Sequence, residues 1–589
     1  MSLAPGSAAG MLLVIAAVAW PASLALAWLV PVARRWLGPL VQTMALPALV
    51  LAFTADAGME LRVVGLYTSL TLGVDPVGRP FLLLKSLLWT VAAVHAATYM
   101  REDPRRSTFT GFLLATGTGN IGLVLAHDAL GFYLFFALMT FAAYGLVVHT
   151  RTAEALRAGR VYIGMAILGE ALLLAGLLAA AGLAGDVSFR TLPAAFADFP
   201  RPDVVAGLLL FGLGVKAGLV PLHVWLPLAH PVAPTPASAL LSGAMIKAGV
   251  LGWLRFLPMG ELALPGLGAA VMGLGVLAMF YAAVLGVLQS DAKTVLAYSS
   301  VSQMGFLATG VGAALVVPDA APLLVLAVAV YALHHALAKG ALFLAIGVVP
   351  ARALRGRISP WLAVAAIPAL ALAGAPLTSG AIAKLALKNA LGELPAPWPA
   401  RVDVLLGAAA VATTLLMARY LATLRARAGT DDATEPYRPG LIGPWAGLVL
   451  VSAAAAAWLP AALAPLGELP LATQPRYIAA AAWPLVLGVA LATGTILLGR
   501  RVATGRLGEA PAGDLIVVAE AAVAAARRAG PPLRALREQV PQTRIARWLA
   551  RVAADPVDRT ARALEAATTG PALGAVLCVL AGLLFMALR

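Results

Sequence analysis

Lysines are the residues of this 589-residue chain whose positions could do chemistry. Lys216, Lys247 and Lys339 each stand deep inside a long apolar segment, with apolar neighbours on both sides. A charged lysine at the centre of a membrane helix costs about 2.5–3.5 kcal/mol, so such residues are kept where they have a function. An amine in a low-dielectric setting also releases its proton more readily than an amine in water. These lysines are therefore candidates for carrying protons inside a membrane.

Further protonatable residues in or beside apolar segments are Glu170, His223, His334, His335 and Lys384. A buried carboxylate stabilises the charged form of a nearby amine, and histidine exchanges a proton close to neutral pH. His334 and His335 are neighbours, so on a helix they point about 100° apart and do not form a metal-binding pair. Lys85 and Lys388 lie nearer to segment ends, and we interpret them as side chains that snorkel to the membrane surface.

The composition is that of a membrane protein. Hydrophobic residues make up 61% of the chain and charged residues only 12%, whereas a soluble domain is about a quarter charged. The single cysteine, Cys578, excludes an intramolecular disulfide and a cysteine-ligated iron–sulfur cluster within the chain. The chain has no P-loop, no dinucleotide-binding glycine motif and no HExxH motif. We therefore expect neither a cofactor nor a metal ion, and no nucleic-acid partner.

Apolar segments long enough to cross a bilayer, about 20 residues each, define the predicted fold. We identify sixteen: 11–33, 40–57, 78–99, 109–127, 129–149, 161–183, 203–226, 234–257, 264–288, 293–316, 321–348, 359–390, 402–424, 440–463, 477–499 and 571–588. No basic residue precedes the first segment, so we expect it to be a permanent span. The sequence predicts an all-α polytopic membrane protein with about 16 transmembrane helices.

The arginines predict the orientation. The chain has 35 arginines, and they cluster after the odd-numbered segments, as at 34–35, 101–106 and 151–160. Because cytoplasmic loops carry an excess of basic residues, both termini are expected on the outer face of a cytoplasmic-type inner membrane. Arginine stays protonated, whereas a buried lysine can lose its proton, so the seven lysines and the arginines have different roles.

Two predicted spans are interrupted in the same way. Residues 214–227 read GVKAGLVPLHVWLP and residues 373–384 read AGAPLTSGAIAK, so each places glycine and proline beside a lysine. Interrupted helices in corresponding positions of two halves are typical of inverted-repeat transporters, with the break lining the ion path.

Residues 513–567 have a different pattern. Apolar residues recur at helical spacing among many arginines, and several prolines interrupt the run. This pattern predicts helical segments lying along the cytoplasmic membrane surface as a lateral arm. The alternative is a plain linker to the last span.

Several motifs resemble the antiporter-like membrane subunits of respiratory complex I, the Mrp cation/proton antiporters and the group 4 membrane-bound hydrogenases. They are FYLFFALMT at 132–140, KAGLVPLHVWLP at 216–227 with APTP at 233–236, SDAKTVLAYSSVSQMG at 290–305 and HALAKGALF at 335–343. The resemblance covers roughly residues 75–430. It implies that Lys216, Lys247, Lys339 and Lys384 match the family's functional lysines, and that His335 matches its histidine.

The resemblance also implies a domain organisation with two inverted five-helix repeats. The expected parts are 1–108 (helices 1–3), 109–257 (helices 4–8), 258–427 (helices 9–13), 428–512 (helices 14–15), 513–570 (lateral arm) and 571–589 (terminal helix). Broken helices 7 and 12 would each sit inside a half-channel, and a polar axis would run along the membrane plane.

One departure from the family pattern concerns an acidic residue. Where the family usually carries a glutamate after the aromatic run, this chain has Phe136 followed by Ala137. We expect Glu170, on the next segment, to take over and to set the charge of Lys216. The alternative is that Glu170 satisfies only a local polar contact.

The predicted function is a proton-translocating subunit of a complex I-like or membrane-bound hydrogenase-like energy-converting complex. A proton would pass from Lys216 through Lys247 and the His334/His335 region to Lys339 and Lys384, and leave on the outside. The alternatives are an Mrp-type cation/proton antiporter subunit, which could also carry sodium, and a proton-coupled partner of an inorganic-carbon uptake complex. The chain has no redox centre of its own, so partner subunits, redox subunits among them, would supply the driving force.

Overall fold

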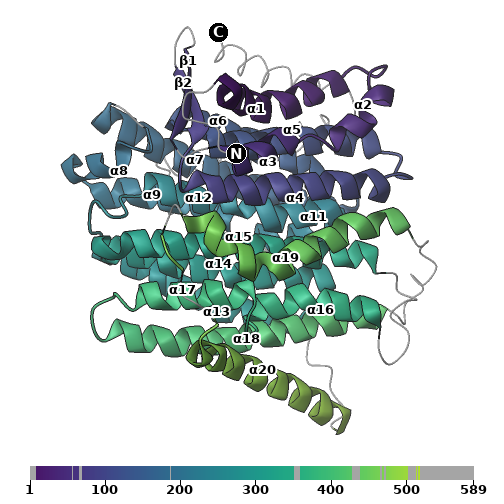
Figure 1. Ribbon diagram of the computed structural model, residues 1–589, viewed down its shortest axis with the longest axis vertical. Coiled ribbons are helices and arrows are strands. Elements are labelled where there is room, and N and C mark those ends of the chain that lie inside the picture. Colours follow the sequence, from purple (N-terminus) through teal and green to yellow (C-terminus); the bar gives the residue numbers. More distant parts are fainter. Residues whose placement is uncertain are drawn as a thin grey trace, which may run out of the picture.

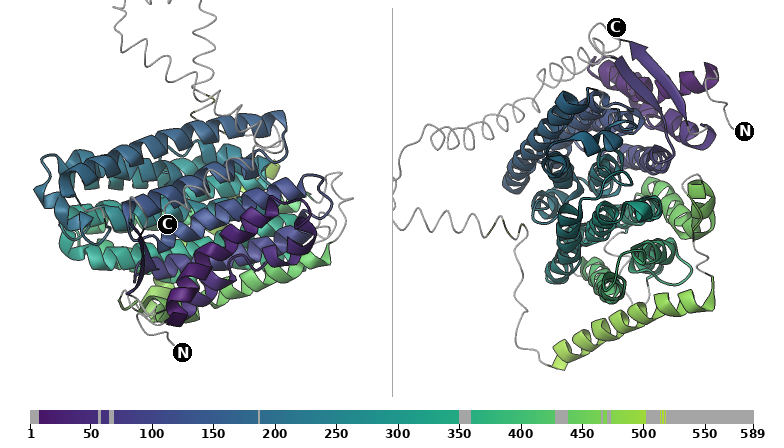
Figure 2. Two further views of the ribbon diagram at one scale, coloured as in Figure 1. Left: turned by 90° about the horizontal axis from the view of Figure 1, so that it is seen from above. Right: turned by 90° about the vertical axis from the view of Figure 1, so that its left-hand side faces the viewer.

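The computed structural model describes residues 8–55, 58–64, 69–185, 188–349, 359–427, 438–464, 467–469 and 473–501, and the single residues 513, 515 and 517. This part is mostly helical, with long helices side by side across the molecule (Figure 1). The N-terminal helices lie at one edge of the array and helix α20 at the opposite edge (Figures 1 and 2). The predicted arm, except for residues 513, 515 and 517, and the predicted terminal span lie outside the described residues.

The helices before the first break are α1 (Ala8–Trp28), α2 (Arg34–Val41), α3 (Leu46–Thr54), α4 (Gly78–Tyr99), α5 (Arg106–Leu125), α6 (Ala129–Val147), α7 (Ala153–Ala184), α8 (Leu192–Ala195) and α9 (Pro202–Ala217). After it come α10 (Trp225–Val232), α11 (Thr235–Leu240), the π-helical η2 (Leu241–Met245), α12 (Ile246–Phe256), α13 (Pro265–Val287), α14 (Ala292–Val316), α15 (Ala321–Val348), α16 (Pro360–Ala373), α17 (Ser379–Leu391), α18 (Trp398–Ala426), α19 (Ile442–Leu463) and α20 (Pro475–Arg501). Short 3-10 turns occupy Phe196–Asp198, Pro318–Ala320 and Pro439–Leu441.

Thirteen helical segments of the described chain are long and apolar enough to cross a membrane, and each overlaps a segment predicted from hydropathy. The two interrupted spans are absent from this set because each is divided into shorter helices, α9 with α10 and α16 with α17. The structure therefore places both breaks where glycine and proline predicted them.

The two breaks have the same backbone geometry. Helix α9 ends before Gly218, whose φ is +77°, and α16 ends before Gly374, whose φ is +88°. In each break the residue after the glycine donates its N–H to a carbonyl five residues back, Leu219 to Gly214 at 2.9 Å and Ala375 to Leu370 at 3.0 Å. Both ends are Schellman motifs, in which glycine takes the left-handed conformation without steric cost.

The sequence prediction missed a β-hairpin. Strands β1 (Met59–Val64) and β2 (Ser69–Val74) pair antiparallel, with Met59 opposite Val74. Leu72 extends the pairing by an isolated bridge to Ala126, at the end of α5. The prediction of an all-α chain is wrong here because the strands are too short for hydropathy to distinguish them from a loop.

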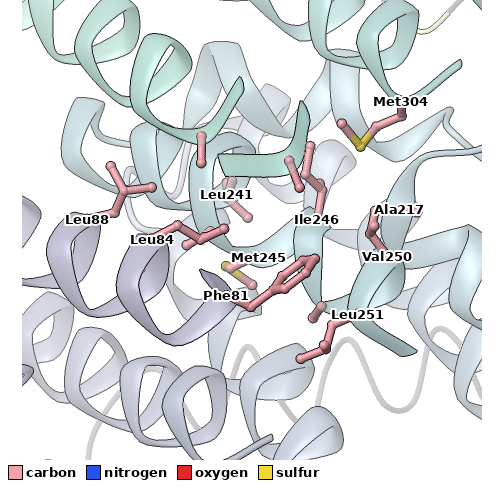
Figure 3. Close-up of a cluster of buried hydrophobic side chains, with 14 of the residues drawn as sticks. Phe81, Leu84, Leu88, Ala217, Leu241, Met245, Ile246, Val250, Leu251 and Met304 are labelled. Carbon is pink, nitrogen blue, oxygen red and sulfur yellow. The ribbon is translucent and has the colours of Figure 1, made fainter. Parts of the chain in front are cut away.

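Apolar packing surrounds the centre of the molecule. Figure 3 shows Phe81, Leu84 and Leu88 of α4 directed toward the η2 and α12 segments, where Met245 and Val250 lie. All five side chains are almost fully buried. The charged groups of α12, Lys247 and Arg255, therefore lie in a low-dielectric environment.

Candidate functional site

Lys216 lies at the end of the first half-helix, on the last turn of α9. Its ammonium nitrogen donates a hydrogen bond to the Tyr162 hydroxyl at 3.2 Å. It also lies 5.2–5.8 Å from the ring centroids of Tyr162, Phe136 and Trp225, within cation–π range. Only 4% of Lys216 is exposed, so aromatic faces and one hydroxyl replace its hydration shell.

Glu170 of α7 lines the same small cavity as Lys216 and Tyr162. The cavity measures about 10 Å³, which is about the space that one water molecule needs. Glu170 is 5% exposed, and neither carboxylate oxygen has a hydrogen-bond partner among the described residues. The carboxylate and the ammonium group interact electrostatically. Phe136 lines this cavity as well, so Glu170 and Lys216 face the segment where the acidic residue is missing.

Lys247 and His335 form a direct pair. The Lys247 nitrogen is 2.5 Å from His335 Nδ1 and donates a second hydrogen bond to the Ser242 carbonyl at 2.7 Å. Ser242 belongs to η2, the π-helical turn just before Lys247, and such turns occur often at functional sites. Neither Lys247 nor His335 is exposed.

Lys339 follows His335 by one helical turn on α15, so both side chains share a face of that helix. Its nitrogen donates to the Leu296 carbonyl at 2.7 Å. His230, which the sequence prediction passed over, is fully buried and stacks on Phe343. It interacts electrostatically with Lys339 and Lys247. His230 could have been identified from the sequence, because it is a single histidine in the otherwise apolar segment Trp225–Val232.

His334 points in a different direction from His335. Its Nδ1 is 2.8 Å from the Ser379 hydroxyl, at the start of the second half-helix α17. Lys384, further along α17, reaches back and donates to the Ala373 carbonyl at 2.6 Å. Lys216 and the ammonium group of Lys384 thus both lie at the carbonyl end of a broken half-helix, of α9 and α16 respectively, where the helix dipole favours positive charge.

A cavity of about 270 Å³ lies beside Lys384, between α17, α18 and α20. Lys388 and Asp403 line it and form an ion pair at 2.6 Å, with nearly half of each side chain exposed. The predicted exposure of Lys388 near a segment end agrees with this. The same prediction is wrong for Lys85, which is fully buried and donates to the Asn120 carbonyl at 3.4 Å.

The structure brings the predicted residues together in three groups: Glu170 with Lys216; Lys247 with His335 and Lys339; and His334 with Ser379 and Lys384. In the part of the chain described, no hydrogen bond links Lys216 to Lys247. His223 lies in the first break, fully buried, with its ring edge-on to Tyr281 of α13.

A fourth group of charges, near one end of the bundle, was not predicted. Arg255 of α12 pairs with Asp75, just after the hairpin, and donates to three carbonyls at the end of α5, those of Leu123, Val124 and Ala126. His127 Nδ1 lies 2.8 Å from the Glu60 carboxylate of β1, which accepts a hydrogen bond from it, and His127 Nε2 lies 3.7 Å from the Asp75 carboxylate. This group joins the hairpin, α5 and α12.

These features define a class: a polytopic helical membrane protein with two broken helices and a central row of buried lysines. The sequence profile of the family described as NADH:quinone oxidoreductase/Mrp antiporter, TM, matches residues 126–398. Over this region, which is a little under half of the chain, the sequence is similar to antiporter-like membrane subunits of complex I, hydrogenase and Mrp type. Homologues in this family are subunits of multisubunit membrane complexes.

Two curated relatives illustrate the match. Hydrogenase-4 component B of Escherichia coli is 33% identical over 299 residues, which are 49% of this chain and 44% of the relative. NAD(P)H-quinone oxidoreductase chain 4 1 of Picosynechococcus is 33% identical over 248 residues, 41% of this chain and 45% of the relative. The matched regions therefore span less than half of each relative.

A solved structure shares the fold. The Mrp complex from Dietzia superposes with a TM-score of 0.73 at 22% identity, covering 92% of this chain and 61% of the matched chain. At this identity the superposition shows a shared fold and no more.

Proposed function

We propose that this chain is a proton-translocating subunit of a complex I-like or membrane-bound hydrogenase-like energy-converting complex. The observation that carries the proposal is the Lys247–His335 pair, a direct amine-to-imidazole contact in a fully buried position. An imidazole can accept the proton of an ammonium group and pass it on. Lys339, one turn further along α15, extends the row of proton carriers.

The entry group of the proposed path is Glu170 with Lys216. The carboxylate favours the charged lysine when the two are close, and separation would remove that support. The aromatic rings and the Tyr162 hydroxyl hold the ammonium group where no bulk water reaches it. Because no hydrogen bond links Lys216 to Lys247, transfer between them requires water or a movement of α9 against α12.

The exit group is His334 with Lys384. His334 and His335 are adjacent on α15. His335 contacts Lys247 and His334 contacts Ser379, so α15 connects the central pair to the second broken helix. The 270 Å³ cavity beside Lys384 would provide the release path. Moving one charge against 100 mV costs about 2.3 kcal/mol, which partner subunits would have to supply.

The matching Schellman breaks support the expected division into two inverted repeats, 109–257 and 258–427, as part of this proposal. The clustering of arginines after the odd-numbered segments supports an orientation with the arginine-rich ends in the cytoplasm.

The test uses inverted membrane vesicles from the native host, carrying the whole complex with Lys339→Ala or Lys339→Arg in this chain. Arginine keeps the positive charge but does not release its proton, so both variants should lose proton uptake. Vesicles energised by NADH or by molecular hydrogen would identify the redox reaction, and an imposed sodium gradient would test the antiporter alternative. Normal proton uptake by both variants under all three conditions would refute the relay.

A further inference from the structure

A cavity of about 600 Å³ lies at one end of the bundle. Its lining residues come from the first 113 residues and include none of the residues of the three lysine groups. Its walls come from the end of α1, the full length of α2, the end of α4 and the start of α5. Figure 1 shows α2 at the end of α1, at the same edge of the molecule as α5. Trp28 of α1 lines the cavity, and its indole N–H donates a hydrogen bond to the Ser107 carbonyl at 2.9 Å.

Three arginines line this cavity: Arg34, Arg35 and Arg106. Within the described residues none of them forms an ion pair with a carboxylate. The acidic residues of the adjacent α4–α5 loop have other partners, since Asp103 pairs with His149 at 3.0 Å and Glu102 with Arg438 at 2.8 Å. Among the described residues, no ion pair balances the positive charge of the cavity.

The α4 side of the cavity is apolar. Its lining there runs from Ala93 through Ala96 and Ala97 to Met100, just after the helix, a stretch of about 10 Å at 1.5 Å per residue. Trp36, 71% exposed, stands beside the arginines with the Arg35 guanidinium 5.3 Å from its ring. Because tryptophan concentrates at the membrane–water interface, the arginines lie at headgroup depth and the alanine wall extends toward the acyl chains.

We propose that this cavity binds one anionic phospholipid, with its phosphate on Arg34, Arg35 and Arg106 and an acyl chain along Ala93 and Ala97. Basic pockets between membrane helices recognise anionic headgroups, and guanidinium groups hold phosphate by paired hydrogen bonds. A free phosphate ion would use the arginines but not the apolar wall, so the shape of the cavity favours the lipid. The site involves none of the proposed proton carriers.

The test is native mass spectrometry of the purified full-length chain, titrated with phosphatidylglycerol or phosphatidylcholine. The parent chain should bind phosphatidylglycerol preferentially. An Arg34→Gln/Arg35→Gln/Arg106→Gln variant should bind it about tenfold or more weakly, since each arginine beside an anionic lipid adds to its affinity. Ala97→Phe, which fills the acyl path at an exposed lining position and keeps all three charges, should also weaken binding.

The matched control is Arg151→Gln/Arg157→Gln/Arg160→Gln, which removes three arginines from the same end of the bundle but outside the cavity. It should bind phosphatidylglycerol like the parent chain. Equal binding of the two lipids by the parent, or unchanged binding by the cavity variants, would overturn the proposal. Loss of binding in the arginine variant alone, with Ala97→Phe unaffected and inorganic phosphate competing, would replace the lipid by a simple anion and overturn it too.

Discussion

The ammonium nitrogen of Lys247 and the Nδ1 atom of His335 are 2.5 Å apart, although the residues are 88 positions apart in the chain and both are fully buried. The contact joins two groups that can each hold a proton. If the proton passes through this contact, removing either group interrupts the same step.

A double-mutant cycle tests that contact. Lys247→Met and His335→Gln should each lower proton flux by about tenfold or more, and the double variant should be no worse than either, because groups that act as a unit are strongly non-additive. His95→Gln, a buried histidine of α4 outside the three groups, is the control and should keep most of the flux. Additive losses in the double variant would mean that the two residues act in separate steps.

Glu170→Gln tests the entry group. The change removes the charge that supports the ammonium form of Lys216 while preserving shape, so proton flux should fall by about tenfold, equivalent to about 1.4 kcal/mol. Glu154→Gln makes the same substitution at an exposed position on the same helix and should be neutral. Flux measured in vesicles of equal protein content decides the matter: an unimpaired Glu170→Gln variant would leave Glu170 a local polar contact only.

Arg255 is expected to dominate the stability of the hairpin end. Arg255→Met would leave Asp75 buried without its partner and three α5 carbonyls without a donor, at a cost of about 3–5 kcal/mol. The thermal unfolding temperature in detergent should fall sharply, whereas Arg201→Met, at an exposed ion pair, should change it little. Combining Arg255→Met with Asp75→Leu should restore part of the loss. No recovery in that double variant would indicate that the carbonyl contacts matter more than the charge.

His127 and Asp75, beside Arg255 at the hairpin end of the bundle, should make the stability of the protein depend on pH. Burial lowers the pKa of His127 below its usual 6.5, and Arg255 lowers it further against the opposing effect of Glu60. Burial acts to raise the pKa of Asp75, but Arg255 and His127 hold it below 3.8. In both cases the unfolded chain binds protons more readily than the folded chain, so stability is lost as pH falls, below about 6.5 for His127 and below 3.8 for Asp75.

Unfolding temperatures measured between pH 8 and pH 5 should therefore decrease toward the acid side, and His127→Gln should flatten that decrease. The unchanged slope of a His127→Gln variant would assign the pH dependence to another group, such as His149 with Asp103.

Much of the architecture was predictable because it depends on local patterns. Long apolar runs located the membrane helices, and glycine with proline located both breaks, since Gly218 and Gly374 take the left-handed conformation that glycine adopts most readily. The lysines were recognisable because a buried amine is costly wherever the helix packs. These signals require no knowledge of which helices are neighbours.

Pairings between distant helices were not predictable. Nothing local indicates that Lys247 meets His335, or that Tyr162 holds Lys216. Lys85 was misjudged because its depth depends on neighbouring helices that cover the end of its own. Arg255 was not singled out from the sequence, because nothing local indicates that Asp75 and the end of α5 lie beside it.

Arg255 and Lys247 share helix α12, about 12 Å apart along its axis at 1.5 Å per residue. Arg255 is fastened to the hairpin side through Asp75 and to the end of α5 through three carbonyls. A partner that displaced the hairpin would have to break these bonds or move α12 with it. The π-helical turn η2, at the start of α12 near Lys247, is the irregular point at which α12 can shift. The hairpin is therefore mechanically coupled, through Arg255 and α12, to the fully buried Lys247.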